Sequence, residues 1–321
     1  MNSLSICVLG GTGFVGSRLV TRLIAAGHRV KVLTRNREQH RHLLVLPELQ
    51  LVNANVHDAV QLAVQFASID VVVNLVGILN ERGYGGAGFR AAHTELARKV
   101  TQACLSAGVT RLLHMSSLRA DARTGPSHYL RSKGEAEDIV RRDCGSAIDY
   151  TIFRPSVIFG PGDSFINRFA QLLGMLPLIF PLARASARFA PVYVGDVVEA
   201  LMRCLHGGAA SRSSLELCGP EIFTLREIVS FTARTLGLKR SIVALPDFIG
   251  RTQAFIFDFV PGKPFSSDNF RSLTVDSICS EDGFARLGIK PQPMAGIVHQ
   301  YLGDKSASGL LDEYRESARR A

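Results

Sequence analysis

A serine, a tyrosine and a lysine have the types and the spacing needed for proton transfer. Tyr129 and Lys133 stand four residues apart, so on a helix they lie on one face, one turn from each other. A free phenol has a pKa of roughly 10, and a nearby ammonium group lowers it because positive charge favours the phenolate. Ser117 comes earlier, at the end of an expected strand, where its hydroxyl would meet the same substrate oxygen. The three side chains predict an acid/base site for a carbonyl or hydroxyl group.

The elements that would position this site begin with a glycine-rich turn. An apolar run typical of a strand precedes it, and an amphipathic helical pattern follows. Gly10 permits the tight turn, Gly13 lets a ligand approach the backbone, and Gly16 lets the helix lie close to the sheet. Unpaired N–H groups at the helix start favour a pyrophosphate, so the turn predicts a dinucleotide site. The residues predicted to bind the dinucleotide here are Gly10, Thr12, Gly13, Phe14, Val15 and Gly16.

The end of the next strand, residues 29–34, distinguishes the two nicotinamide dinucleotides. In such folds an acidic residue there accepts from the adenosine ribose of NAD, and a nearby arginine accommodates the 2′-phosphate of NADP. This chain has Arg35 and Arg37 after Thr34 and no acidic residue among them. We therefore expect NADP(H) to be preferred, with NAD(H) as the alternative. The competing interpretation is that both arginines are merely solvated loop residues.

Three further strand ends would complete the site, because ligands of open α/β sheets bind outside the carboxyl edge. The strands are expected over residues 49–54, 70–76 and 111–115, and the second is a continuous apolar run typical of a strand buried on both faces. An asparagine after the first either meets the adenine edge or only forms a turn. A tyrosine–lysine pair placed beyond this edge would work beside a nicotinamide. The candidate cofactor residues at these ends are Asn55, Val56, Leu75, Val76, Gly77 and Ser116.

Several motifs together resemble the extended short-chain dehydrogenase/reductase superfamily, in its epimerase/dehydratase branch. They are the glycine pattern of residues 10–16, Ser116-Ser117, Tyr129-x-x-x-Lys133 and Arg154-Pro-Ser-Val-Ile-Phe-Gly-Pro-Gly162. Within the superfamily, three stretches are similar to the nucleotide-binding accessory subunit of respiratory complex I and its bacterial relatives. These stretches are residues 114–118, 129–137 and 154–170.

The resemblance implies a role for each residue of the candidate site. Ser117 would polarise the substrate, Tyr129 would act as acid and base, and Lys133 would hold the nicotinamide ribose and tune the tyrosine. Pro155 and Ser156 would line the nicotinamide end. The chain also departs from the family pattern. Only eleven residues separate Ser117 from Tyr129, a shorter loop than most active members have, and Ala54-Asn55-Val56 replaces the usual Gly-Asp-Leu.

Two functions follow. The first is an NADP(H)-dependent oxidoreductase or epimerase that acts on a carbonyl or hydroxyl carbon of a small-molecule or quinone-like substrate. The alternative is a non-catalytic accessory protein of respiratory complex I or of quinone metabolism, in which NADPH is a structural ligand. The short loop between the serine and the tyrosine is the observation that favours the alternative.

The alternation of strand and helix patterns, together with the resemblance, predicts the fold. We expect an α/β protein with a Rossmann-type doubly wound parallel sheet in residues 1–160, to which residues 189–205 return. Residues 161–321 would form a smaller C-terminal α/β lobe for substrate or partner. The polar stretch 304–321 is expected to be a solvated helix or a frayed tail.

Composition narrows the partners. The net charge is +9, but the basic residues are spread and no nucleic-acid motif occurs, so we expect no nucleic acid. No histidine spacing predicts a metal site. The six scattered cysteines are interpreted as buried free thiols in a reducing, cytoplasmic compartment. The apolar stretches 172–183 and 248–260 would pack inside the lobe, against a partner such as a respiratory complex, or peripherally on the inner face of a membrane. The sequence predicts no oligomeric state.

Overall fold

The computed structural model describes residues 3–261 and 263–302. The terminal stretch 304–321, expected to be a helix or tail, lies outside the described residues. The chain divides into two compact units. The first contains the described part of residues 1–155 with residues 195–217 and 280–290, and the second contains residues 156–194, 218–279 and 291–321 where they are described. Residues 280–290, which the sequence analysis placed in the C-terminal lobe, thus belong to the first unit.

The first unit is built on a seven-stranded sheet in which every neighbouring pair is parallel. Its order is β11-β6-β5-β4-β1-β2-β3. The strands are β1 (Ser5–Leu9), β2 (Arg29–Thr34), β3 (Leu49–Asn53), β4 (Val71–Asn74), β5 (Arg111–Met115), β6 (Asp149–Pro155) and β11 (Ser213–Leu217). The strand order reverses between β1 and β4, which is where a crevice opens at the carboxyl edge of such sheets. The prediction of a doubly wound parallel sheet is confirmed.

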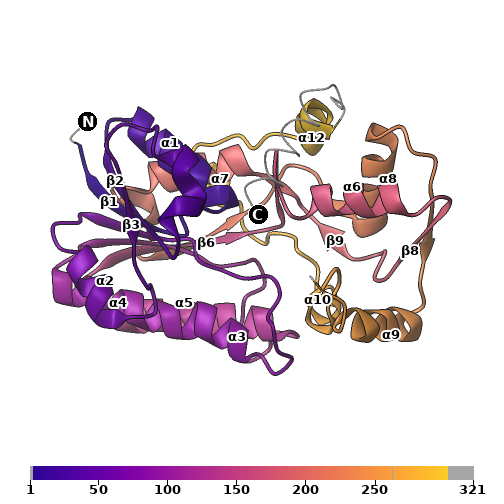
Figure 1. The fold of residues 1–321 in the computed structure, drawn as a ribbon, viewed down its shortest axis with the longest axis horizontal. Coiled ribbons are helices and arrows are strands. Elements are labelled where there is room, and N and C mark those ends of the chain that lie inside the picture. The colour runs from indigo at the N-terminus through magenta and orange to yellow at the C-terminus, as the bar shows by residue number, and fades with distance from the viewer. Residues whose placement is uncertain (1–2, 262, 303–321) are drawn as a thin grey trace. The chain divides into compact units, whose positions relative to one another are not determined.

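Helices cover both faces of this sheet. Figure 1 shows α1 (Phe14–Ala25) and α7 (Val194–Arg203) on one face, and α2 (Ala59–Gln65), α4 (Leu96–Ala107) and α5 (His128–Cys144) on the other. The strands β1 and β4 are buried on both sides, because apolar helix stripes pack on each face. The remaining helical segments are α3 (Ala87–Phe89), a π-helix (Arg90–Glu95), α11 (Gly283–Arg286) and the 3-10 helices Arg37–Leu43 and Gly208–Ala210.

The second unit is a smaller α/β lobe, as expected. Its strands pair two by two: β7 (Ile158–Phe159) with β10 (Val192–Tyr193), β9 (Arg188–Phe189) with β12 (Phe223–Thr224), and β8 (Ile179–Leu182) with β13 (Ser241–Ala244). Its helices are α6 (Ile166–Met175), α8 (Leu225–Thr235), α9 (Asp247–Phe257), α10 (Ser267–Ser272) and α12 (Met294–Leu302). A reciprocal cap between Thr224 and Glu227 starts α8, so the sequence pattern fixes that helix end.

One expectation about the cysteines is wrong. Cys218 and Cys279 form a disulfide within the second unit, whereas Cys7, Cys104, Cys144 and Cys204 are buried free thiols. The two bonded residues stand 61 positions apart in the sequence, and nothing in their local patterns pairs them. A structural disulfide is rare in a reducing compartment, so this bond counts against that interpretation of the cysteines.

The disulfide predicts a thiol count. Denatured protein that has not met a reductant should show four reactive thiols, and all six only after reduction. Since the bond closes a long loop of the unfolded chain, Cys218→Ser is expected to lower the free energy of unfolding by about 2–4 kcal/mol. Thiol titration and denaturant unfolding measure the two effects. Six thiols before reduction would show that the bond does not form.

Candidate functional site

The glycine turn between β1 and α1 is shaped by close backbone contacts. Gly10 has a positive φ of 77°, and a Cβ atom there would lie 3.0 Å from the carbonyl carbon of Leu75. A Cβ atom on Gly16 would lie 2.1 Å from the Gly10 oxygen and 2.6 Å from Gly11 Cα. Any side chain at Gly16 would therefore displace the turn or the helix. Gly13 is exposed, and its N–H donates to Gly10 O over 3.0 Å.

The start of α1 is suited to an anion. Gly13 is its N-cap, and no described side chain caps the helix. The first N–H groups of a helix have no partner within it and carry the positive end of its dipole. The guanidinium of Arg18 lies over the Phe14 ring, 4.6 Å from its centroid, and donates to Phe14 O. The turn and this arginine, which the sequence analysis did not select, fit the diphosphate of a dinucleotide.

The end of β2 carries two basic side chains that are exposed to solvent. Arg35 and Arg37 are exposed, and the guanidinium of Arg35 forms no ion pair with any described carboxylate. The backbone N–H of Arg37 donates to Asn53 Oδ1 over 2.7 Å, which ties the end of β2 to that of β3. Burial lowers the pKa of His57, with smaller contributions from Lys99 and Arg35. Arg35 thus adds positive charge to this edge of the sheet.

The asparagine after β3 forms a turn. Asn55 Oδ1 accepts from the His57 N–H at 3.0 Å, and the side chain of Asn55 is exposed. Val56 is buried against the core. After β4, Leu75 and Val76 lie directly against the glycine turn, as their contacts with Gly10 show. Of the residues predicted at these ends, the β4 group therefore lies closest to the dinucleotide turn.

The β4 end also reaches the helix that carries the tyrosine and the lysine. A Cβ atom on Gly77 would lie 3.1 Å from Lys133 Nζ. Lys133 is buried, and its ammonium group donates to Met115 O at the end of β5. The carboxyl edge of the sheet therefore carries, one after another, Gly10, Leu75, Gly77 and Lys133.

The tyrosine is held by rings and by a hydroxyl. Tyr129 lies at the start of α5, and its phenol is hydrogen-bonded to the Ser117 side chain. The rings of Phe89 and His93 contact it edge-on, with centroids 6.0 Å and 5.6 Å away. Next to the strand end, Ser116 is 3% exposed, and its hydroxyl has no hydrogen-bond partner in the part of the chain that the structure describes. A buried hydroxyl without a partner beside Ser117 is a further feature that a bound ligand would satisfy.

The ionisation of this pair differs from the expectation. Burial raises the pKa of Tyr129, and its hydrogen bond with the Ser117 side chain opposes that shift only in part. Burial lowers the pKa of Lys133 to about 8, although Glu137 favours its charge. The predicted lowering of the tyrosine pKa by the lysine is therefore absent. The phenol keeps its proton at neutral pH, and the ammonium group remains charged below about pH 8.

His93 is a residue that the sequence analysis missed. Its Nε2 accepts from the Ile78 N–H over 3.1 Å, so Nδ1 carries the ring proton and donates to Ser132 Oγ over 2.8 Å. Ser132 Oγ in turn donates to Tyr129 O. Burial, then Lys133 and His114, lower the pKa of His93 to about 2, so the ring is neutral. His93 thus joins the β4 end to α5, and it lies in a π-helix, a distortion often found at functional sites.

The last two predicted residues fall in different units. Pro155 ends β6 in the first unit, and its carbonyl accepts from the Leu118 N–H over 2.9 Å. Ser156 starts the second unit, where its hydroxyl donates to Ser277 O over 2.8 Å. Ser156 is 4% exposed, and this bond satisfies it within its own unit.

The short loop after Ser117 is firmly folded. The Asp121 N–H donates to Leu130 O, and Asp121 Oδ1 accepts from the N–H groups of Arg123 and Thr124. A Cβ atom on Gly134 would lie 2.2 Å from the Ala122 nitrogen, so the loop lies directly on α5. The glycine after Lys133 is therefore the local feature that lets so short a loop pack here.

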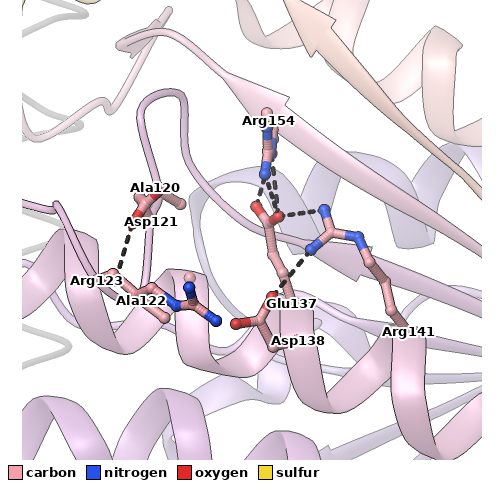
Figure 2. Close-up of a pocket in the computed structure, with 9 residues that line it drawn as sticks. Ala120, Asp121, Ala122, Arg123, Glu137, Asp138, Arg141 and Arg154 are labelled. Atoms are coloured by element: carbon pink, nitrogen blue, oxygen red, sulfur yellow. Dashed lines mark hydrogen bonds and ion pairs between the residues drawn. The ribbon is translucent and has the colours of Figure 1, made fainter.

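A polar cavity of about 370 Å³ lies behind this loop. Figure 2 shows Glu137 between Arg141 and Arg154, with Asp121, Arg123 and Asp138 around them. Glu137 is fully buried and accepts from Arg154 Nε at 2.8 Å and from Arg141 Nη2 at 2.6 Å. The hydrogen bond to Glu137 raises the pKa of Arg154. The carboxylate of Glu137 is thus paired with both Arg141 and Arg154, and no candidate cofactor residue lines the cavity. We therefore interpret these three residues as a structural ion-pair network that joins α5 to β6.

The chain is similar to known proteins that are described as NAD(P)H-binding, as an NADH dehydrogenase subunit or as a reductase. A profile of the family described as NAD(P)H-binding matches residues 10–163. The chain is 30% identical over 315 residues to NADH dehydrogenase [ubiquinone] 1 alpha subcomplex subunit 9, mitochondrial, of Arabidopsis thaliana, covering 92% of this chain and 76% of that protein. It is 29% identical over 242 residues to a ceramide reductase of Caulobacter vibrioides, covering 75% of this chain and 74% of the reductase.

A solved structure shows the same fold. The dTDP-glucose 4,6-dehydratase from Streptomyces venezuelae, determined with NAD bound, superposes with a TM-score of 0.71. The two chains are 21% identical, and the match covers 94% of this chain and 98% of the dehydratase. Within the described residues, no helix is long and apolar enough to cross a membrane.

Proposed function

Since this chain belongs to the family of the complex I alpha subcomplex subunit 9 proteins and its residues 10–163 match the NAD(P)H-binding family, we propose that it is an NADP(H)-dependent oxidoreductase or epimerase. It acts on a carbonyl or hydroxyl carbon of a small-molecule or quinone-like substrate. The observation that carries the proposal is the position of the Lys133 ammonium group beside Gly77 and the Met115 carbonyl, at the sheet edge that also holds the glycine turn.

Each residue has a role in the proposed reaction. NADPH, when bound, supplies a hydride for the carbonyl carbon. Ser117 orients the substrate oxygen, and Tyr129 gives that oxygen its proton, which the raised pKa keeps on the phenol at neutral pH. The ammonium group of Lys133, which lies beside Gly77 at the end of β4, would hold the nicotinamide ribose. In the oxidative direction, the phenolate takes the proton back.

The cofactor part of the proposal is NADP(H) rather than NAD(H). The exposed guanidinium of Arg35, which forms no ion pair with a described carboxylate, supports it, because a charge-assisted hydrogen bond to a phosphate contributes about 1.5–3 kcal/mol. Arg35→Gln is therefore expected to weaken NADPH binding roughly 10- to 100-fold and to leave NADH binding nearly unchanged. Calorimetric titration of both nucleotides measures the effect.

A matched control lies on the same strand. Arg29 is exposed at the amino end of β2, on the opposite edge of the sheet, so Arg29→Gln should bind both nucleotides as the parent protein does. Equal or tighter binding of NADH by the parent protein would contradict the NADP(H) preference.

The alternative function is that of an NADPH-binding accessory protein of a respiratory complex. Two observations favour it: the similarity to complex I subunits and the short, tightly folded loop between Ser117 and Tyr129. In this proposal the nucleotide stabilises the first unit, and the protein acts from the cytoplasm or from the inner face of the membrane through contact with the complex. Replacement of Tyr129 by phenylalanine separates the two functions.

A further inference from the structure

Helix α9 presents its broad apolar face to solvent. Its small residues point inward: Gly250 and Ala254 are buried, and a Cβ atom on Gly250 would touch Ala183 and the Phe270 ring. In an ordinary surface helix the large apolar side chains fill the inner face and the outer face is polar. Here the arrangement is reversed, since the inner face is made of small residues that bring the helix close to its neighbours.

The outer face is aromatic. The side chains of Phe248 and Phe255 lie two turns apart and are 72% and 60% exposed, and Phe259, just beyond the helix, is 65% exposed. The rings of Phe255 and Phe259 meet edge-on with centroids 5.4 Å apart. The neighbouring exposed side chains of this face are Ile249, Ile256 and Val260. We call these six residues the α9 apolar face.

Polar groups around the face have hydrogen-bond or ion-pair partners within the protein. Thr252 lies between Phe248 and Phe255, and its hydroxyl donates to Phe248 O, so it offers the face chiefly its methyl group. Asp247 is paired with Arg184 at 3.1 Å. Asp258 is 7% exposed and accepts from the Ser267 N–H. Asp247 is therefore paired at the surface, and Asp258 is buried.

The exposed charge of this helix that has no ion pair among the described residues is positive. Arg251 is exposed on the border of the face and forms no ion pair with a described carboxylate. The whole chain carries a net charge of +9. Exposed aromatic and branched apolar side chains bordered by a cation are typical of helices that lie in the interface of an anionic membrane. The helix has eleven residues, so it would lie on the bilayer rather than cross it.

We propose that the α9 apolar face docks the protein onto a lipid bilayer with anionic head groups. Phe248, Phe255 and Phe259 insert among the acyl chains, and Arg251 remains at the level of the phosphates. This proposal goes beyond the proposed function and holds whether or not the protein turns over NADPH, because α9 lies in the second unit whereas Ser117, Tyr129 and Lys133 lie in the first.

Vesicle sedimentation of the full chain tests the proposal. The parent protein should sediment with vesicles of phosphatidylcholine and phosphatidylglycerol, more weakly with phosphatidylcholine alone, and less as salt rises. The double variant Phe255→Glu/Phe259→Glu should lower the partition coefficient at least ~100-fold, because burial of each phenyl ring contributes on the order of ten-fold or more. Val60→Glu/Val64→Glu is the matched control, since these exposed valines stand one turn apart on α2 in the first unit. It should bind vesicles as the parent does.

A second measurement does not depend on the charged variants folding. The chain contains no tryptophan, so Phe255→Trp introduces a single reporter. Its emission should shift to the blue with anionic vesicles and be quenched by brominated acyl chains, whereas Val64→Trp should show neither change. Circular dichroism and NADPH titration check that each variant is folded.

Three outcomes would overturn the proposal. The parent protein could fail to sediment with anionic vesicles at low salt. The Phe255→Trp reporter could show no blue shift with vesicles that do sediment the protein. Finally, light scattering without lipid could show a dimer that the double glutamate variant dissociates, in which case the occupant of the α9 apolar face is a second copy of the chain.

Discussion

A Tyr129→Phe variant is expected to bind NADPH as tightly as the parent protein and to lose turnover roughly 10²- to 10⁴-fold. The hydroxyl oxygen is the one heavy atom removed, and the Phe89 and His93 rings that hold the tyrosine remain in contact with the new phenyl ring. Ser117 loses a hydrogen-bond partner, but the backbone of α5 keeps its serine cap. The kinetic loss would therefore report proton transfer rather than loss of fold.

The measurement combines two assays on the same preparation. NADPH titration gives the dissociation constant, and nucleotide oxidation over a panel of aldehydes, ketones and quinones gives turnover. Tyr150→Phe is the matched control, because Tyr150 lies near the amino end of β6, away from the carboxyl edge, and should change neither value. If Tyr129→Phe retains every function of the parent protein, the accessory role is favoured over catalysis.

The glycine turn and the sheet could be predicted because they depend on residues that are close together in the sequence. Gly10 needs a positive φ and Gly16 leaves no room for Cβ, so the spacing of the glycines alone carries the information. The apolar run that becomes β4 is buried on both faces, as a strand between two helical layers must be. Once the strands are parallel, the position of Ser117 beyond β5 follows from chain order.

The rest of the site depends on contacts that sequence patterns do not encode. A histidine at position 93 fits the helical pattern as an ordinary core residue, and only its bonds to Ile78 and Ser132 reveal that it joins two elements. The pKa of Tyr129 was predicted from one neighbouring charge, whereas burial dominates in the structure. Burial depends on residues from several elements and could not be read from the spacing of Tyr129 and Lys133.

The sequence also could not predict which face of α9 is buried. The apolar pattern of residues 248–260 was compatible with a lobe core, a partner interface or a membrane contact. Side-chain size decided the outcome, because Gly250 and Ala254 let the helix approach its neighbours more closely than the phenylalanines could. The disulfide shows the same limit, since the fold alone brings Cys218 to Cys279.

A pair of glycine variants provides the second large expected effect. Gly16→Ala would place a methyl group 2.1 Å from Gly10 O and 2.6 Å from Gly11 Cα, both backbone atoms that cannot swing aside. We expect NADPH binding to fall at least ~100-fold and the free energy of unfolding to fall by about 1–3 kcal/mol, the usual cost of overpacking. Gly85→Ala is the control, since the space around that glycine is open and neither value should change.

Gly13→Ala separates the cofactor site from the fold. A Cβ atom at Gly13 would lie 3.3 Å from Gly10 O, a contact that a shift of a few tenths of an ångström relieves, and the residue is exposed. The variant should therefore unfold as the parent protein does, while its new methyl group fills the space into which a diphosphate must come to reach the start of α1. Titration with NADPH and denaturant unfolding of the same sample measure both effects. If Gly13→Ala binds NADPH with parental affinity, the diphosphate does not lie on this turn, and the placement of the nicotinamide beside Tyr129 fails with it.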